Sequence, residues 1–283
     1  MRSAIKSFSR FTLRASCLMH RPRKRFGQNF LRDQHVLDRI ITAAQLHEGD
    51  RILEIGPGAG ALTNRLLETG LPVLAVEIDR DLGATLQERA DKNLEVVIGD
   101  VLRIDWGDLL RNPPYKLIAN LPYNISSQVL FRVLEHRQSF QRLILMFQKE
   151  VGERLIAQEG SREYGILSVL MQTWFQIDRV VKVPPGAFYP PPKVDSVVLC
   201  LEPLTESRID LVDEERYRKL VRGAFAQRRK TLRNSLLGSG WEPEHVDRAF
   251  EKTHIDPRRR GETLTLEEFG RLANALQADA TGA

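Results

Sequence analysis

The sequence contains little cysteine and no long apolar run. Its 283 residues include only two cysteines, Cys17 and Cys200, which excludes a secreted fold held together by disulfides. No apolar stretch approaches the ~18 residues of a membrane span, and no membrane association is predicted. The six histidines are scattered, so no bound metal is expected. A hydrophobic content of 42% and a charged content of 28% indicate a soluble globular chain, long enough for two domains.

Acidic residues are absent from two parts of the chain. Residues 1–32 contain nine Lys or Arg without an acid, and residues 216–241 contain eight more, again without an acid. The rest carries 25 basic against 37 acidic residues, so the net charge of +5 comes from two basic blocks on an acidic body. Charge separated in this way is typical of proteins that bind polyanions. It fits a disordered tail and a solvated helix face equally well.

Helical and strand-like segments alternate from Asp33 to about Leu204, a pattern typical of an α/β sheet with helices on both faces. A capped amphipathic helix is predicted over 33–46. The predicted strands are the apolar runs 51–55, 73–78, 94–98, 116–119, 143–147, 177–183 and 196–201. The first four should be parallel and buried on both faces. The last two are closely connected, which predicts an antiparallel edge.

A proline-rich segment at 184–192 holds five of the fourteen prolines, and it is predicted to be neither helix nor central strand. Beyond residue 204 the strand signal stops. Helices are predicted there over 213–226, 230–237, 244–250 and 265–276. The sequence therefore predicts a smaller all-helical domain after the sheet.

Three successive predicted strands end in residues suited to a nucleoside. Glu54-Ile55-Gly56-Pro57-Gly58 follows the first strand, and its glycines let the backbone turn sharply and approach a ligand. Glu77 ends the second strand, where a carboxylate can accept both ribose hydroxyls. Asp100 ends the third and can accept from an adenine amino group. A helix N-cap is the alternative role for each acid. At this point a nicotinamide dinucleotide and S-adenosylmethionine both fit, because both present an adenosine.

The fourth strand leads into Asn120-Leu121-Pro122-Tyr123, four residues predicted to be catalytic in methyl transfer to an adenine N6. This amine is a poor nucleophile, so acceptors must hold its two hydrogens. The side chain of Asn120 and the carbonyl of Leu121 can accept one each. Pro122 stiffens the loop and supplies a further carbonyl, and the ring of Tyr123 can stack on a flipped base. No strong general base is needed. The alternative is a strand-to-helix turn in which the Asn caps the helix.

Four segments resemble those of a known family: KRFGQNFL at 24–31, EIGPG at 54–58, NLPYNIS at 120–126 and PPPKVDS at 190–196. The family is that of the ribosomal RNA adenine dimethyltransferases, in particular the type that acts on small-subunit rRNA, and the resemblance covers nearly the whole chain. It implies S-adenosylmethionine-dependent transfer of four methyl groups, two to the N6 of each of two adjacent adenosines in a hairpin loop near the 3′ end of small-subunit (16S-type) rRNA. The implied cofactor contacts are Asn29, Leu31, Gly56, Glu77, Asp100 and Asn120.

The sequence pattern and the resemblance together lead to an expected organisation and partner, and a monomer is the default for the oligomeric state. Residues 1–22 are expected to be a disordered extension, 23–204 a Rossmann-like S-adenosylmethionine-dependent methyltransferase domain with an N-terminal lid segment, and 205–283 a helical domain that binds RNA or the ribosome. The expected partner is rRNA within an immature small ribosomal subunit, whose biogenesis the protein would assist, and the protein is expected to be a monomer.

Four residues outside the strand ends are predicted to contact the substrate. Phe188 lies with Tyr189 on the proline-stiffened loop, where two rings presented together would suit a stacking platform for the flipped base. A buried loop anchor is the alternative for Phe188. Arg228, Arg229 and Lys230 are predicted to lie against RNA backbone.

Other functions and a second location remain open. A nicotinamide-dependent dehydrogenase explains the glycines and Glu77, but neither the 120–123 loop nor the basic blocks. A large-subunit rRNA methyltransferase of the macrolide-resistance type is disfavoured by the helical tail and the 190–196 segment. An assembly factor whose methylation is incidental stays possible. The bacterial cytoplasm is the expected location. Residues 1–18 are Arg- and Ser-containing and free of acid, which also fits an organelle transit peptide, with Met19 as a second candidate start.

Overall fold

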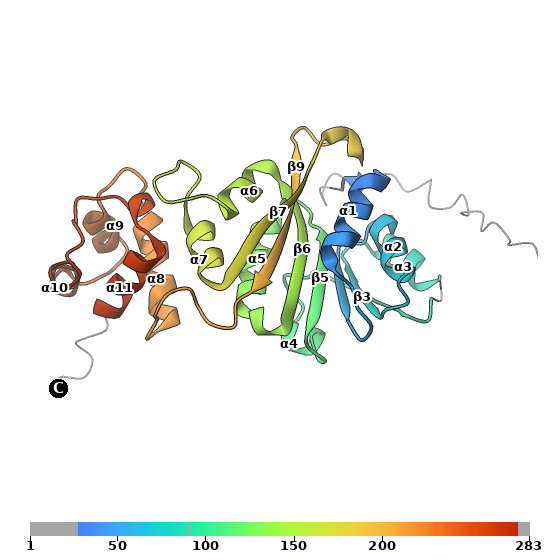
Figure 1. Ribbon diagram of the computed structural model, residues 1–283, viewed down its shortest axis with the longest axis horizontal. Coiled ribbons are helices and arrows are strands. Elements are labelled where there is room, and N and C mark those ends of the chain that lie inside the picture. Colours follow the sequence, from blue (N-terminus) through green and yellow to red (C-terminus); the bar gives the residue numbers. More distant parts are fainter. Residues whose placement is uncertain (1–27, 90, 277–283) are drawn as a thin grey trace, which may run out of the picture.

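The computed structural model describes residues 28–89 and 91–276, so the predicted extension over 1–22 and Cys17 lie outside the described residues. Its centre is a seven-stranded sheet with the order β4-β3-β2-β5-β6-β9-β7 (Figure 1). The strands are β2 (Ile52–Ile55), β3 (Val73–Glu77), β4 (Leu94–Ile98), β5 (Tyr115–Asn120), β6 (Phe140–Gln148), β7 (Phe175–Val183) and β9 (Ser196–Pro203). Each predicted strand is confirmed.

The sheet is mixed, as predicted. The five strands from β4 to β6 are parallel, whereas β9 runs antiparallel to both β6 and β7. All four residues of β2 are buried, which fits a strand covered on both faces. The strand order reverses between β2 and β5, and in open α/β sheets ligands bind at such a point, beyond the carboxyl ends of the strands.

Helices cover both faces of the sheet. On one face α1 (Gln34–Ala44) and α2 (Ala61–Leu67) share an apolar core with Ile118 of β5, and α3 (Arg80–Gln87) packs on β4. On the other face the neighbouring Leu117 joins a core with α4 (Trp106–Leu109), α5 (Ser126–Glu135), α6 (Lys149–Leu155) and α7 (Ile166–Trp174). Asp33 accepts a hydrogen bond from the N–H of Val36, which confirms the predicted cap of the first helix.

The proline-rich segment forms a small structure of its own. Pro185–Ala187 is a single turn of 3₁₀ helix and is followed by β8 (Phe188–Tyr189), which pairs antiparallel with β1 (Phe30–Leu31). The prediction of no central strand is confirmed. The prediction of no helix is wrong for this one turn, because Pro185 occupies a first helical position, where its missing N–H costs nothing.

The last part of the described chain is helical, as predicted, with α8 (Glu214–Phe225), α9 (Leu232–Gly238), α10 (Pro243–Thr253) and α11 (Leu266–Ala275). These helices lie at one end of the long axis of the molecule (Figure 1). They share the apolar core of α5 and α7. The buried hydroxyls of Thr173 on α7 and Tyr217 on α8 are 2.8 Å apart where these two helices meet. The domain boundary near residue 204 stays a prediction. No helix within the described residues is long and apolar enough to cross a membrane.

Candidate active site

A cavity of about 320 Å³ opens beside the ends of β2, β3, β4 and β5, a size typical of small-molecule sites. Nine of the predicted cofactor-binding or catalytic residues line it: Asn29, Leu31, Gly56, Glu77, Asp100, Asn120, Leu121, Pro122 and Tyr123. The structure therefore brings together residues that lie far apart in the sequence. Their roles stay predictions.

The turn after β2 requires its glycines. Gly56 has a φ of +71° and Gly58 a φ of +57°. These values lie in the left-handed region, which residues that carry a Cβ rarely adopt. A Cβ on Gly58 would lie 3.0 Å from the ring of Phe30. A Cβ on Gly56 would lie 3.5 Å from Cδ of Pro122. The turn can therefore approach both the N-terminal segment and the loop after β5.

Glu77 is held by the backbone around it. Its Oε2 accepts from the N–H of Gly58 at 2.9 Å and its Oε1 from the N–H of Asp79 at 2.8 Å. The side chain is buried, and burial raises the pKa of Glu77 above its usual range. The carboxylate is thus fixed at the cavity wall.

Glu54 is a second buried acid of the cavity, and sequence reasoning gave it no role. Its residue is 1% exposed, and its Oε2 has no hydrogen-bond partner among the described residues. Burial, reinforced by the nearby charge of Glu77, raises the pKa of Glu54 to about 8, while Thr63 and Arg89 offset part of this rise. A glutamate inside an otherwise apolar strand was the available signal, because such a residue is almost never buried without a reason.

The charge of the cavity wall has one sign. Glu54, Glu77 and Asp100 line it, and within the described residues no lining side chain is Lys or Arg. Glu54 adds no charge near pH 7, because its pKa is raised to about 8. The other two acids, in a lining without Lys or Arg, suit a positively charged ligand better than an anionic pyrophosphate. The wall therefore favours a cationic cofactor.

Asp100 follows β4 and organises the turn there. Its Oδ1 accepts from the N–H of Leu102 at 3.0 Å, and its Oδ2 lies 3.5 Å from Nε of Arg103. The next helix begins only at Trp106 with Asp105 as its cap, so the alternative in which Asp100 is a helix N-cap is wrong, and Asp100 holds a turn instead. The side chain of Asp100 remains 30% exposed, so it is open to a ligand in the cavity.

Asn120 is the last residue of β5, and its amide is oriented by the N-terminal segment. Nδ2 donates to the carbonyl oxygen of Asn29 at 3.2 Å, which leaves Oδ1 as an acceptor. The N-cap of α5 is Ile125, so the alternative in which Asn120 caps this helix is wrong. The carbonyl of Pro122 accepts from Ile125 N–H at 3.1 Å and so holds the turn, whereas the carbonyl of Leu121 has no donor among the described residues.

Tyr123 is tied to the sheet through its hydroxyl. The phenol oxygen lies 2.6 Å from Oγ of Ser196, a residue that is 1% exposed. Burial raises the pKa of Tyr123 above its ordinary value, so the side chain is a neutral phenol near pH 7 and does not serve as a base.

The N-terminal segment lies along the cavity. Gln28 donates to Asp79 at 3.2 Å, and Asn29 accepts from Asn120. Leu31 is buried in the core of α1, where β1 pairs with β8. Sequence reasoning from periodicity missed Asn29 and Leu31, because a two-residue strand leaves no periodic pattern.

Phe188 does not lie where it was expected. It is 4% exposed and packs in the core with Leu31 and Val183, away from the cavity lining. Tyr189, by contrast, is 50% exposed, and the guanidinium of Arg32 lies 4.1 Å from the centre of its ring. The expectation of two rings presented together is wrong, because alternate residues of a strand point to opposite sides. The position of Phe188 is that of the buried anchor.

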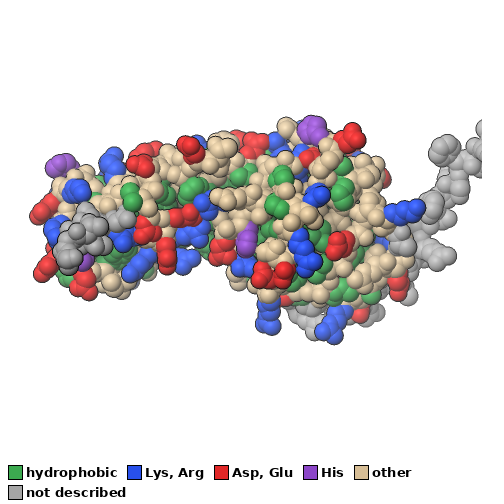
Figure 2. All heavy atoms as spheres, turned by 90° about the horizontal axis from the view of Figure 1, so that it is seen from below, with side chains coloured by type: hydrophobic (Ala, Val, Ile, Leu, Met, Phe, Trp, Pro, Cys, Tyr) green, Lys and Arg blue, Asp and Glu red, His purple; other side chains and the backbone are tan. Residues whose placement is uncertain are grey.

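The second basic block is not free of acids in space. Arg216 pairs with Asp213 at 3.7 Å, Arg218 with Glu214 at 2.6 Å and Arg233 with Asp247 at 2.5 Å. Basic and acidic side chains accordingly alternate over the helical end in Figure 2. The absence of acids from residues 216–241 in the sequence therefore does not make this part of the surface uniformly basic.

The three residues predicted to contact RNA backbone lie between α8 and α9. Arg228, Arg229 and Lys230 are exposed and far from the cavity in sequence and fold, and Arg228 donates to the carbonyl of Arg162. No ion pair to these three residues occurs among the described residues. Their charges thus remain available to a partner.

Comparison with known proteins gives consistent matches. The sequence model of the ribosomal RNA adenine dimethylase family matches residues 19–278. The ribosomal RNA small subunit methyltransferase A of Syntrophotalea carbinolica is 60% identical over 258 residues, covering 91% of this chain and 98% of the relative. The protein of the same name from Geobacter metallireducens is 49% identical over 265 residues, covering 91% and 96%.

Solved structures agree. A dimethyladenosine transferase from Plasmodium falciparum superposes with a TM-score of 0.73 at 29% identity, covering 86% of this chain and 95% of that one. The 23S rRNA methyltransferase ErmE gives a TM-score of 0.64 at 28% identity, covering 88% and 99%. The α/β methyltransferase fold expected from the sequence is confirmed, and the chain belongs to the ribosomal RNA adenine dimethylase family.

Proposed function

We propose that this enzyme uses S-adenosylmethionine to dimethylate the N6 of two adjacent adenosines in the hairpin loop near the 3′ end of small-subunit rRNA. Membership of the adenine dimethylase family supports the reaction, and the names of the 60% and 49% identical relatives support the small subunit. The observation that carries the proposal is the amide of Asn120. Its nitrogen is engaged by Asn29, so its oxygen is left at the cavity to accept a hydrogen from the target amine.

The residues of the cavity fit the cofactor. When bound, S-adenosylmethionine supplies an electrophilic methyl group on a sulfonium. Glu77, held by two backbone N–H groups, would accept the ribose hydroxyls, and Asp100 would accept from the adenine amino group. The Oε2 of Glu54 is buried without a hydrogen-bond partner among the described residues and is left to interact with a polar group of the cofactor. Because the pKa of Glu54 is raised to about 8, this side chain adds no negative charge near pH 7.

The loop after β5 would hold the target base. Asn120 Oδ1 and the carbonyl of Leu121 would each accept one hydrogen of N6, which turns the lone pair out of conjugation with the ring. Tyr123 would stack on the flipped base. Because Tyr123 is a neutral phenol, the loop contributes alignment rather than proton abstraction. The surplus proton becomes acidic as the new bond forms.

The other candidate functions are less well supported. A dinucleotide-dependent dehydrogenase would place a pyrophosphate against Glu77 and Asp100, in a cavity whose described lining contains no Lys or Arg. A large-subunit methyltransferase is represented by ErmE at 28% identity, well below the small-subunit relatives. The immature subunit as partner, the monomeric state and the bacterial cytoplasm remain our proposals, the last supported by the bacterial source of these relatives.

The proposal is tested by mass mapping of methylated adenosines after small subunits that lack the modification are incubated with the protein and S-adenosylmethionine. We expect two adjacent dimethyladenosines near the 3′ end. Methylation confined to large-subunit rRNA would contradict the proposal. An Asn120→Ala variant should lose methylation while retaining particle binding, which also separates the enzyme from an assembly factor.

A further inference from the structure

We infer that Ser196 is a positioning residue for the target base, acting through the ring of Tyr123. This inference rests on the proposed function, in which that ring stacks on the flipped adenine. It assigns a role to the segment 190–196, which the active site otherwise leaves unexplained, and to the residues at the junction of β6 and α6 that contact it.

Tyr123 lies on a loop, and the contacts of the loop hold its backbone rather than its ring. Ile125 N–H donates to the carbonyl of Pro122 at 3.1 Å, and Ser126 Oγ donates to the carbonyl of Tyr123 at 3.2 Å. The far end of the side chain has one hydrogen-bond partner among the described residues, Oγ of Ser196 at 2.6 Å. The direction of the ring axis therefore depends on Ser196.

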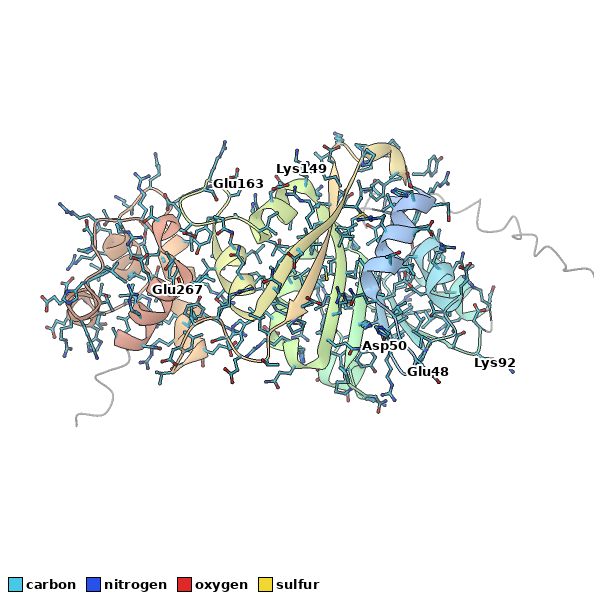
Figure 3. The ribbon with its side chains drawn as sticks, viewed as in Figure 1. Glu48, Asp50, Lys92, Lys149, Glu163 and Glu267 are labelled. Atoms are coloured by element: carbon cyan, nitrogen blue, oxygen red, sulfur yellow. The ribbon has the colours of Figure 1, made fainter. Side chains whose placement is uncertain are left out.

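Ser196 is buried and held by the sheet on both sides. It is the first residue of β9 and pairs with Gln148 of β6 on one side and Val183 of β7 on the other. The preceding carbonyl, that of Asp195, accepts from the N–H of Lys149 at 2.9 Å, and Figure 3 labels Lys149 at this end of the sheet. Segments 148–150 and 190–196 thus meet to fix one buried hydroxyl.

The physical role of this bond follows from the shape of a phenol. The oxygen lies on the axis about which the ring turns, so a hydrogen bond fixes where the axis points and leaves rotation about it free. Because Tyr123 has an elevated pKa and Ser196 is neutral, the bond joins two uncharged groups. It therefore contributes direction, which a stacking surface requires, more than charge.

The test compares Ser196→Ala, Tyr123→Phe and the double variant in single-turnover methylation of unmodified small subunits. We expect each single variant to slow the reaction about 5–20-fold. This reduction lies between the effect expected from losing one neutral hydrogen bond and the roughly 100-fold effect expected from a 1 Å misplacement of the base. The double variant should be no slower than either single one. The Kd for S-adenosylmethionine should change less than about two-fold in all three. Ser196→Thr, which keeps the hydroxyl, should restore most of the rate.

Ser168→Ala provides the matched control. Ser168 is a buried serine on α7 whose hydroxyl donates to the carbonyl of Arg154, so its loss should lower the Tm without a comparable change in rate. A wild-type rate for Ser196→Ala, or losses that multiply in the double variant, would overturn the inference.

A spectroscopic measurement separates this inference from the proposed function. With tyrosine labelled with ¹³C at Cζ, Ser196→Ala should shift the resonance of Tyr123 and leave those of the other four tyrosines in place. An unmoved Tyr123 resonance contradicts the inference whatever the activity. Failure of the wild-type protein to methylate small subunits contradicts the proposed function, while the resonance still reports on the bond.

Discussion

Glu77 at the end of β3 accepts a hydrogen bond of 2.9 Å from the backbone N–H of Gly58, in the turn that follows β2. One carboxylate thus joins two strand ends that a Rossmann-like site uses for different parts of its ligand. The geometry of the glycine turn and the orientation of the proposed ribose acceptor are therefore coupled.

Replacing Glu77 should separate these two roles. Glu77→Gln keeps one acceptor oxygen but loses the charge, and we expect the Kd for S-adenosylmethionine to rise about 10–100-fold, since hydrogen bonds to a charged group contribute roughly 1.5–3 kcal/mol. Glu77→Ala should also destabilise the protein by about 1–3 kcal/mol, because the buried N–H of Asp79 and the half-buried N–H of Gly58 lose their acceptor. Calorimetry gives both quantities. The exposed Glu95 of the next strand supplies the control Glu95→Gln, and equal affinities for Glu77→Gln and this control would refute the role.

Glu54 makes stability depend on pH. Its pKa is raised to about 8 in the folded protein, while the unfolded chain has an ordinary carboxyl, so between these pKa values the folded state binds a proton that the unfolded state has released. Stability should therefore fall as the pH rises from about 5 to 8, and the loss persists above pH 8, on the order of 4 kcal/mol. Glu54→Gln should remove this slope and unfold at a higher temperature than wild type at pH 9. Parallel Tm profiles of the two proteins between pH 5 and 9 would show that Glu54 titrates normally.

Gly58 should tolerate a side chain less well than Gly70. Both have a positive φ, +57° and +75°, but a Cβ on Gly58 meets the ring of Phe30 at 3.0 Å, whereas a Cβ on Gly70 meets nothing within 4 Å. Gly70→Ala should cost only the backbone strain, about 1 kcal/mol. Gly58→Ala should cost more and weaken cofactor binding, because the ring of Phe30, which lines the cavity, must shift to make room for the Cβ. Thermal unfolding and cofactor titration measure the difference, and indistinguishable variants would mean that Phe30 yields without cost.

The exposed cations between α8 and α9 should contact the particle electrostatically. Reversing the charges of Arg228, Arg229 and Lys230 should lower the slope of log K against log salt for small-subunit binding by about 2–3, since each phosphate contact contributes roughly 0.7–0.9. Reversing Arg258, which is 86% exposed but paired with Asp256, is the control and should leave the slope near its wild-type value. A slope unaltered by the triple reversal would identify these residues as a solvated surface.

The parts of this molecule that follow a local pattern could be predicted from the sequence. Continuous apolar runs such as 143–147 gave the buried strands, and parallel topology then brought Glu77, Asp100 and Asn120 to one edge. The pairing of Phe30 with Tyr189 could not be predicted, because two-residue strands 159 positions apart leave no periodicity. The ion pair of Arg233 with Asp247 was hidden for a related reason, because Asp247 lies outside the block in sequence and reaches it only through the packing of α10 against α9. The pair of Arg218 with Glu214 lies within one helix at an i,i+4 spacing, which the sequence does show.

The shared core beneath α7 and α8 has a consequence for the choice of substrate. Tyr217 is buried against Thr173, and one apolar core runs from the sheet into the terminal helices. The distance between the exposed cations at 228–230 and the loop at 120–123 is therefore fixed by the fold. Under the proposed function, a particle is modified only if the distance between its target hairpin and the RNA backbone that binds residues 228–230 matches this fixed distance. The protein would then modify only particles whose rRNA has already folded into that arrangement, and naked rRNA of the correct sequence would be a poor substrate.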